Sequence, residues 1–167
     1  MPNKNDVGLT RHFTATGFVV SDGHVLLHWH AKVKAWLPPG GHIEENEDPV
    51  QAVCREVLEE TGLEVRVVKT GYEVDLDYPE QIQTPYLIMI EDIHDPVDGF
   101  HKHIDMIYFC KIIGHKRQLK DGWLWVNRED ILNGVSLAVS DSLPTCPPQD
   151  VRILAERAFD IIGNDEG

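Results

Sequence analysis

The sequence predicts an α/β or α+β sandwich in which a mixed β-sheet lies between helices. Two observations favour this fold class: short β-rich segments recur along the chain, and only a few amphipathic segments with helical spacing lie among them. Strands with few interspersed helices are typical of helices that pack on a sheet. At 167 residues the chain is expected to form a single domain over residues 1–167, with residues 1–11 as a flexible N-terminus.

The first strands are predicted on either side of a turn. Residues 13–20 are β-rich, and Ser21, Asp22 and Gly23 form a turn into residues 25–29, so the two segments are expected to form a hairpin. Residues 36–41 contain two prolines and two glycines. Proline lacks the amide donor and glycine favours loops, so we expect a loop and no helix there.

A helix is predicted to begin at Asp48 and to end at Gly62. Asp48 can cap the first helical amides, Pro49 fits the first helical position, and Gln51 completes a pattern like a capping box. Gly62 fits the left-handed C-cap. The spacing gives the helix one apolar stripe, formed by Val50, Val53, Cys54 and Val57.

The second half of the chain is expected to supply the remaining elements. A long polar loop is predicted over residues 92–103, a short helix over 128–132 and a closing amphipathic helix over 150–162. Strands are expected at residues 64–70, 86–90, 104–113 and 123–126.

The composition excludes several classes of protein. The formal net charge is −13, from 28 acidic residues against 15 Lys and Arg, and so acidic a surface repels the backbone of a polynucleotide. A small phosphorylated ligand is not excluded, because a bound metal ion can reverse the local field. Neither a membrane helix nor a secretory signal is evident in the sequence. Three widely spaced cysteines fit reduced thiols, so we expect a cytoplasmic protein with no polynucleotide or membrane partner.

The polar side of the predicted helix over residues 48–62 carries a cluster of acids. Glu56, Glu59 and Glu60 are spaced i, i+3 and i+4, so their carboxylates converge within one helical turn. A solvated acidic face is one interpretation of three such glutamates. A divalent cation with oxygen ligands is the other, because it would convert their repulsion into binding. The preceding glycine pair and the adjacent Arg55, which can orient a carboxylate, favour the cation.

The pattern around these glutamates resembles the complete Nudix box. Gly41 is followed after five residues by Glu47, and after seven more by the segment REVLEETGL at residues 55–63. All nine defining positions of the box are met. The resemblance implies a Nudix-type α/β/α sandwich with a mixed sheet, and it implies that the box binds Mg²⁺, with Mn²⁺ as an alternative, around a diphosphate.

The resemblance also implies roles for individual residues. The metal ligands would be the carbonyl of Gly40 and the carboxylates of Glu56, Glu59 and Glu60. The catalytic residues would be Glu56, Glu59, Arg55 and Glu47, with Arg55 orienting the glutamates. Substrate would contact Gly41, His42 and Lys34.

The implied activity is that of a Mg²⁺-dependent pyrophosphohydrolase. It would cleave a diphosphate linkage in a nucleoside diphosphate derivative, such as a nucleoside triphosphate, nucleotide sugar or dinucleotide, by metal-activated water. The base would be Glu56 or a downstream acid, for which the candidates are Glu91, Asp92, Asp95 and Asp98. The alternative is an inactive Nudix-fold module that binds a nucleotide. Either would act as a monomer or homodimer.

Substrate choice is not decided by the sequence. Pro79 and Tyr78 resemble, respectively, markers of ADP-ribose hydrolases and of dinucleoside polyphosphate hydrolases, and the two hints cancel. Several histidines lie near the predicted site, among them His101 and His103. Two histidines at i, i+2 can bind zinc, but no third ligand stands at a zinc-like spacing, so contacts to substrate or within a polar loop are preferred.

Overall fold

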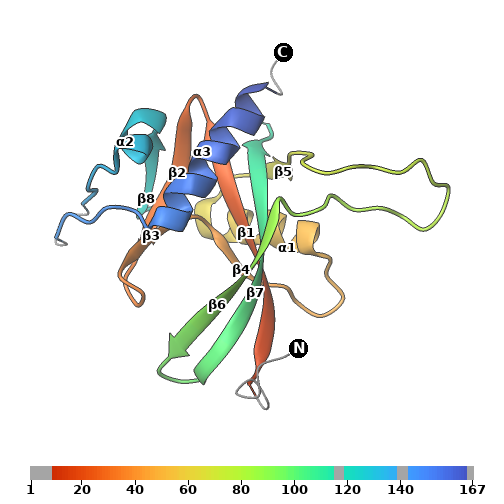
Figure 1. Ribbon diagram of the computed structural model, residues 1–167, viewed down its shortest axis with the longest axis horizontal. Helices are drawn as coiled ribbons and strands as arrows, with labels where there is room; N and C mark the ends of the chain where they lie inside the picture. Colours follow the sequence, from red (N-terminus) through yellow and green to blue (C-terminus); the bar gives the residue numbers. More distant parts are fainter. Residues whose placement is uncertain (1–8, 115–118, 139–142, 165–167) are drawn as a thin grey trace.

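The computed structural model describes residues 9–114, 119–138 and 143–164. These residues form an eight-stranded sheet and three helices (Figure 1). The elements follow in the order β1 (Arg11–Ser21), β2 (His24–His30), β3 (Ala35–Leu37), β4 (Gly40–His42), α1 (Pro49–Thr61), β5 (Val65–Val67), β6 (Leu87–Asp95), β7 (Gly99–Ile112), β8 (Trp123–Asn127), α2 (Arg128–Asn133) and α3 (Gln149–Asn164).

The centre of the sheet is the pair β1 and β7, whose strands run parallel. Arg11 lies opposite Lys102 at one end of this pair, and Val20 lies opposite Lys111 at the other. Strands β2 and β4 pair antiparallel with β1, and β5 and β6 pair antiparallel with β7. Strands β3 and β8 extend the sheet from β2. The predicted mixed sheet and the predicted N-terminal hairpin are therefore confirmed.

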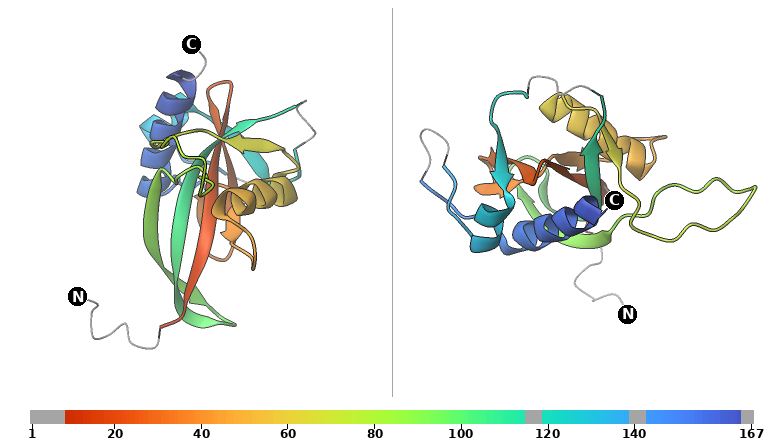
Figure 2. Two further views of the ribbon diagram at one scale, coloured as in Figure 1. Left: turned by 90° about the vertical axis from the view of Figure 1, so that its right-hand side faces the viewer. Right: turned by 90° about the horizontal axis from the view of Figure 1, so that it is seen from above.

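Helices α1 and α3 cover opposite faces of the sheet (Figure 2). Successive side chains of a strand point to opposite faces, and β1 is apolar on both. Ala15 and Val19 pack with the buried residues of α1, whereas Phe18 and Val20 pack with those of α3. The predicted sandwich, with the sheet between helices, is confirmed. No helix in the described ranges is long and apolar enough to cross a membrane.

The predicted ends of α1 are confirmed by its caps. The Asp48 carboxylate accepts hydrogen bonds from the amides of Val50 and Gln51 at 2.8 and 2.9 Å, and the Gln51 side chain accepts from the Asp48 amide at 3.0 Å. Gly62 ends the helix with a left-handed φ of 81°. Buried Val53 and Val57 fix the helix on the sheet, which turns its acidic side toward β4.

The predicted polar loop over residues 92–103 is wrong. This segment is the end of a long hairpin, in which β6 and β7 pair from Leu87 opposite Ile107 to Asp95 opposite Gly99. The Asp95 carboxylate closes the turn by accepting from the amides of Val97 and Asp98 at 2.7 and 3.1 Å. Strands pair through their backbone groups and do not require apolar side chains, so the polar sequence of this segment gave no sign of the two strands.

Other boundaries differ from the predictions by a few residues. The strand expected over residues 64–70 is limited to β5, and the loop expected over residues 36–41 contains most of β3 and β4. Residues 1–8 of the predicted N-terminal segment lie outside the described residues, whereas Arg11 already belongs to β1.

Candidate active site

Arg55 holds the carboxylates of the box in place. Its guanidinium donates two hydrogen bonds to Glu47, from Nε at 2.8 Å and from Nη2 at 2.9 Å. Nη1 donates to Glu56 at 2.8 Å and to Glu59 at 3.2 Å, and Nη2 also donates to the carbonyl of His42 at 2.9 Å. Hydrogen bonds between charged partners are stronger than neutral ones. Arg55 therefore ties α1 to β4 and to the loop between them, and it orients three of the four box glutamates.

The backbone of β4 lies directly against the α1 carboxylates. Pairing with β1 sets Gly40 opposite Thr16, and the Gly40 amide donates to Oε2 of Glu60 at 3.1 Å. A Cβ on Gly41 would lie 2.5 Å from Oε1 of Glu56, far inside ordinary contact. Gly41 thus leaves room for the Glu56 carboxylate in its observed position. A Cβ on Gly40 would instead lie 2.7 Å from the Ala15 carbonyl oxygen of β1, so Gly40 is required by the close approach of the two strands.

The surroundings of the carboxylates differ in how well they stabilise negative charge. Burial raises the pKa of Glu60, and the neighbouring Glu56 and Glu59 raise it further against the opposing effect of the Gly40 amide. The hydrogen bond from Arg55 instead lowers the pKa of Glu47. Glu60 therefore lies in a field of like charge. A divalent cation with oxygen ligands would relieve that repulsion.

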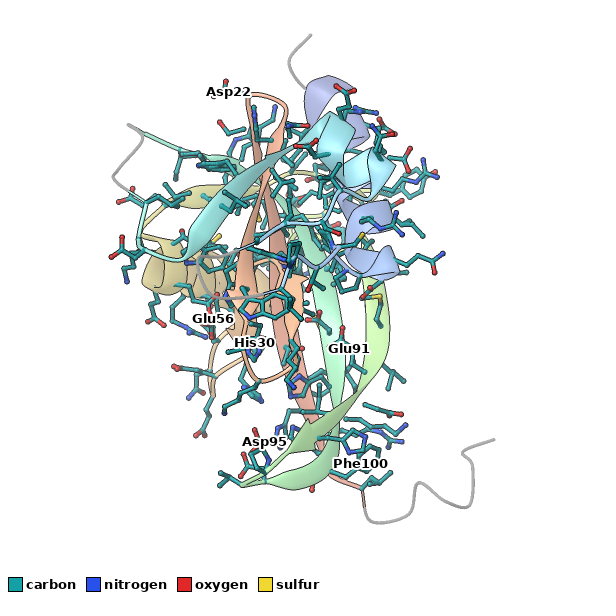
Figure 3. All side chains as sticks on the ribbon, turned by 90° about the vertical axis from the view of Figure 1, so that its left-hand side faces the viewer. Asp22, His30, Glu56, Glu91, Asp95 and Phe100 are labelled. Atoms are coloured by element: carbon teal, nitrogen blue, oxygen red, sulfur yellow. The ribbon has the colours of Figure 1, made fainter. Side chains whose placement is uncertain are left out.

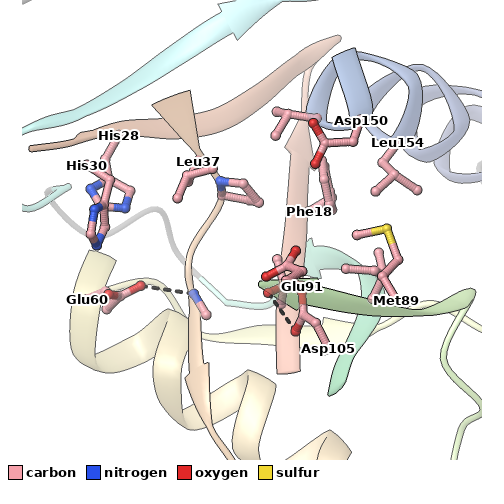
Figure 4. Close-up of a pocket in the computed structure, with 15 residues that line it drawn as sticks. Phe18, His28, His30, Leu37, Glu60, Met89, Glu91, Asp105, Asp150 and Leu154 are labelled. Atoms are coloured by element: carbon pink, nitrogen blue, oxygen red, sulfur yellow. Dashed lines mark hydrogen bonds between the residues drawn. The ribbon is translucent and has the colours of Figure 1, made fainter. Parts of the chain in front are cut away.

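A cavity of about 200 Å³ opens beside Glu60, on the α3 side of the sheet (Figure 4). Its apolar wall includes Phe18, Leu37, Met89 and Leu154. The polar groups that line it include His28, His30, Glu60, Glu91, Asp105 and Asp150. In the view of Figure 4 the two histidines lie at the end near Glu60, and Glu91 lies at the other end with Asp105 and Asp150. An apolar hollow with a few convergent polar groups is typical of a ligand site.

Glu91 has a strongly perturbed pKa within this cavity. Burial raises its pKa to about 7, and the charges of Asp105 and Asp150 contribute to the rise. Asp105 is itself 4% exposed and accepts hydrogen bonds from the hydroxyls of Thr14 at 2.9 Å and Thr16 at 3.0 Å. A carboxyl group with a pKa near neutrality is suited to take up and release a proton.

The other downstream acids have different positions. Asp92 is exposed and forms an ion pair with Lys102 at 2.9 Å. Asp95 closes the hairpin turn, and Asp98 lies within that turn, away from the cavity. Strand alternation accounts for the difference, because Glu91 and Met89 point to the same face of β6 while Asp92 points to the other. Of the four downstream acids that are candidates for the base, Glu91 is the one that lines the cavity.

The predicted substrate-binding residues are dispersed. Gly41 lies against Glu56, whereas the ring of His42 contacts His12, with Nε2 of His42 3.2 Å from Nδ1 of His12. Lys34 is exposed in the turn between β2 and β3, where its amide donates to the carbonyl of His30 at 2.8 Å. Neither His42 nor Lys34 lines the cavity beside Glu60. Their role in substrate binding stays a prediction.

The segment between β5 and β6 extends away from the sheet (Figure 1). It contains the two residues that gave conflicting hints about substrate, Tyr78 and Pro79. Tyr78 is 86% exposed, and neither residue lines the cavity.

Sequence reasoning missed three residues of this region. Asp105 and Asp150 line the cavity. The ring of Trp123 lies tilted against that of His28, with centroids 4.4 Å apart, and its Nε1 donates to the Glu60 carbonyl at 3.0 Å. One signal was available for Asp105, because an acid within an apolar strand is costly to bury without a partner. The positions of Asp150 and Trp123 depend on how α3 and β8 pack, and their local sequence gives no such sign.

Parts of the chain are similar to curated proteins. An RNA pyrophosphohydrolase from Bartonella henselae is 38% identical over 61 residues, which make up 35% of each chain. A bis(5'-nucleosyl)-tetraphosphatase from Rattus norvegicus is 34% identical over 56 residues, or 32% of this chain and 38% of the relative. The matched segments thus span little more than a third of either relative.

Two broader comparisons cover most of the chain. A solved hydrolase of the NUDIX family from Clostridium perfringens is 30% identical, with a TM-score of 0.72, over 92% of this chain and 99% of that one. The NUDIX domain family itself matches residues 10–141, which include all of the box. With the box carboxylates gathered around Arg55 on the matching fold, the chain belongs to the NUDIX family.

Proposed function

We propose that this protein is a Mg²⁺-dependent pyrophosphohydrolase, with Mn²⁺ as an alternative cofactor, which cleaves a diphosphate linkage in a nucleoside diphosphate derivative. The observation that carries the proposal is the position of Glu60. Its carboxylate belongs to the acidic cluster of α1 and also lines the cavity on the α3 side of the sheet. A diphosphate could therefore lie against the carboxylates while the rest of the substrate enters the cavity.

The donor set fits a hard divalent cation. Carboxylate oxygens are the ligands that Mg²⁺ prefers, and Glu56, Glu59 and Glu60 converge within one helical turn. The approach of Gly41 to Glu56 fits a tightly arranged site with a backbone ligand, for which we propose the Gly40 carbonyl. When bound, the cation would neutralise phosphate oxygens and make a water molecule more acidic.

The chain itself supplies orientation and a proton acceptor. Arg55 fixes the carboxylates of Glu56 and Glu59, because its guanidinium is already bonded to Glu47 and to the β4 backbone. For the base we propose Glu91, whose carboxylate would hold the proton released by the attacking water. Glu56, the other candidate, is occupied by its hydrogen bond from Arg55 at 2.8 Å.

The cavity limits how much of the substrate it can hold. Its volume of about 200 Å³ is below the roughly 300 Å³ at which pockets for whole drug-sized ligands begin, so one base or sugar enters and the rest stays outside. The apolar wall formed by Phe18, Leu37, Met89 and Leu154 suits the face of a base. Two of the relatives are named for activity on RNA and on a dinucleoside tetraphosphate, so both types of substrate are included in the test below.

The test is a screen for hydrolysis with Mg²⁺ or Mn²⁺ across nucleoside triphosphates, nucleotide sugars, ADP-ribose, dinucleoside polyphosphates and 5'-triphosphate RNA. We expect activity on at least one small nucleotide, and complete loss on chelation with EDTA. Glu60→Gln should lower kcat by about 100-fold or more with an unchanged circular dichroism spectrum, because it removes a charged ligand.

The matched control is Glu129→Gln, which removes the same charge from an exposed position in the first turn of α2. It should leave kcat within about twofold of the unmodified protein. Hydrolysis that persists in EDTA would contradict the metal requirement. Binding of a nucleotide without turnover of any substrate would instead identify a binding module.

A further inference from the structure

Four histidines meet on the sheet beside the box. His12 lies on β1, His42 ends β4, and His101 and His103 lie on β7. Nδ1 of His12 is 3.2 Å from Nε2 of His42, and Nε2 of His101 is 3.2 Å from Nε2 of His103. One ligand nitrogen from each of His12, His101 and His103 lies within 4.8 Å of the other two. Residues that lie far apart in the sequence thus present imidazole nitrogens to a common point.

The strand register brings these side chains together. The parallel pairing of β1 and β7 sets His12 opposite His103, and His101 lies two residues earlier on the same face of β7. The antiparallel pairing of β4 with β1 sets His42 opposite Thr14. Thr14 lies two residues after His12 and points to the same face of β1, so His42 lies beside His12. All four histidines lie on paired strands, so the cluster is part of the sheet.

The hydrogen bonding of His101 prepares a ligand atom. Its Nδ1 lies 3.1 Å from the Gly99 carbonyl, which can only accept, so Nδ1 carries the proton and donates. In the neutral ring this leaves the lone pair on Nε2, the atom that faces His103. A backbone carbonyl that fixes the tautomer in this way is the usual outer partner of a metal-binding histidine.

The spacing and charge of the cluster fit a transition metal. Tetrahedral ligands about 2.05 Å from a zinc ion are separated from each other by about 3.3 Å. The His12–His42 and His101–His103 pairs stand at 3.2 Å, and the nitrogens of His12, His101 and His103 lie within 4.8 Å of one another, so small ring rotations would complete the set. His101 is 4% exposed. The four histidines line a shallow pocket, and Asp95 and Asp98 line the same pocket and supply negative charge. Figure 3 places Asp95 near the tip of the β6–β7 hairpin.

We propose that His12, His101 and His103 form a binding site for Zn²⁺, with His42 as the fourth ligand. This site is separate from the acidic cluster of α1, because it offers imidazole nitrogen where the box offers carboxylate oxygen. The ion would join β1, β4 and the β6–β7 hairpin. It would also fix His42, whose carbonyl accepts a hydrogen bond from Arg55, so the site adjoins the carboxylates without sharing their ligands.

The test measures zinc bound by the full chain with no histidine tag. Equilibrium dialysis against Zn²⁺ in a large excess of Mg²⁺, followed by elemental analysis, should give one tightly bound zinc per chain. Loss of an outer hydrogen-bond partner of a ligand costs about 10–100-fold in metal affinity, so loss of a ligand should cost at least about 100-fold. We expect that loss in each of His12→Gln, His101→Gln and His103→Gln.

Two variants serve as controls. His94→Gln removes an exposed histidine from the same hairpin, where its ring lies against Phe100, and Glu60→Gln removes a box carboxylate. Both should keep the zinc. Circular dichroism and thermal melting of the metal-free variants show whether they fold. If the three histidine variants do not fold, the visible spectrum of the Co²⁺ form of the unmodified protein decides, because four nitrogen ligands give intense bands and six oxygen ligands give weak ones.

Three results of the zinc measurements would overturn the proposal. They are the absence of tightly bound zinc in the unmodified protein, equal affinity in the folded histidine variants, and loss of zinc in Glu60→Gln but not in those variants. A weak six-coordinate Co²⁺ spectrum would do the same. None of these readouts depends on hydrolysis, so the outcome is independent of the proposed function.

Discussion

Replacing Gly41 with alanine tests how closely the box carboxylates are positioned. An added Cβ would lie 2.5 Å from Oε1 and 2.6 Å from Cδ of Glu56. To reach ordinary contact at 3.4 Å, the carboxylate must move by about 0.9 Å. We expect that movement to break its 2.8 Å hydrogen bond with Arg55. Gly41 does not have a positive φ, so the contact itself, and not backbone strain, is the cause of the change.

The expected effect is large on catalysis and small on stability. A misplacement of about 1 Å in a catalytic site can cost about 100-fold in rate, so kcat of Gly41→Ala should fall by about 100-fold. Loss of one partly solvated, charge-assisted hydrogen bond should lower the free energy of unfolding by no more than about 2 kcal/mol. The assays are steady-state hydrolysis of the substrate found in the screen and denaturation by urea.

The matched control is Gly163→Ala, at a glycine of α3 where an added Cβ meets no atom within 4 Å. It should leave kcat unchanged. A Gly41→Ala variant with kcat within about threefold of the unmodified protein would refute the reasoning, because Glu56 would then tolerate displacement from its place beside Gly41.

Two further predictions concern pH and the start of α1. Glu91 can accept a proton only when it is ionised. If Glu91 is the base, kcat should therefore rise with pH up to the Glu91 pKa of about 7 and level off above it. A bound cation would lower that pKa and shift the rise to more acidic pH. Glu91→Gln should be slow and should lose this rise, and a variant with an unchanged pH profile measured from pH 5 to 9 would exclude Glu91 as the base. Asp48→Ala removes the two hydrogen bonds that cap α1 and should lower the free energy of unfolding, measured by urea denaturation, by about 1 kcal/mol. An unchanged free energy of unfolding would show that the cap does not stabilise the protein.

Features carried by neighbouring residues could be predicted from the sequence. The capping box at Asp48 and the C-cap at Gly62 depend on contacts within one helical turn, and both are where the sequence places them. The ion pair between Arg55 and Glu59 follows from the i, i+4 spacing of a helix in the same way. The mixed sheet between helices was also predictable, because β1 and β7 are apolar on both faces and α1 on one.

The hairpin of β6 and β7 could not be predicted in the same way. Its tip carries polar side chains on both faces, so hydrophobic alternation gives no signal, and backbone pairing alone makes the strands. The identity of the acid in the cavity was concealed for the same reason. Once β6 exists, alternation directs Glu91 into the cavity and Asp92 outward to Lys102.

The sequence by itself determined the box, because its helix, caps and carboxylates interact over a few residues. The tertiary structure decided which distant residues join it. In the sequence, His101 and His103 form a pair with no third ligand at a zinc-like spacing. The parallel pairing of β1 with β7 places His12 beside them, although His12 precedes His101 by 89 residues. No local spacing encodes a contact of that kind, since it depends on which strands pair and in which register.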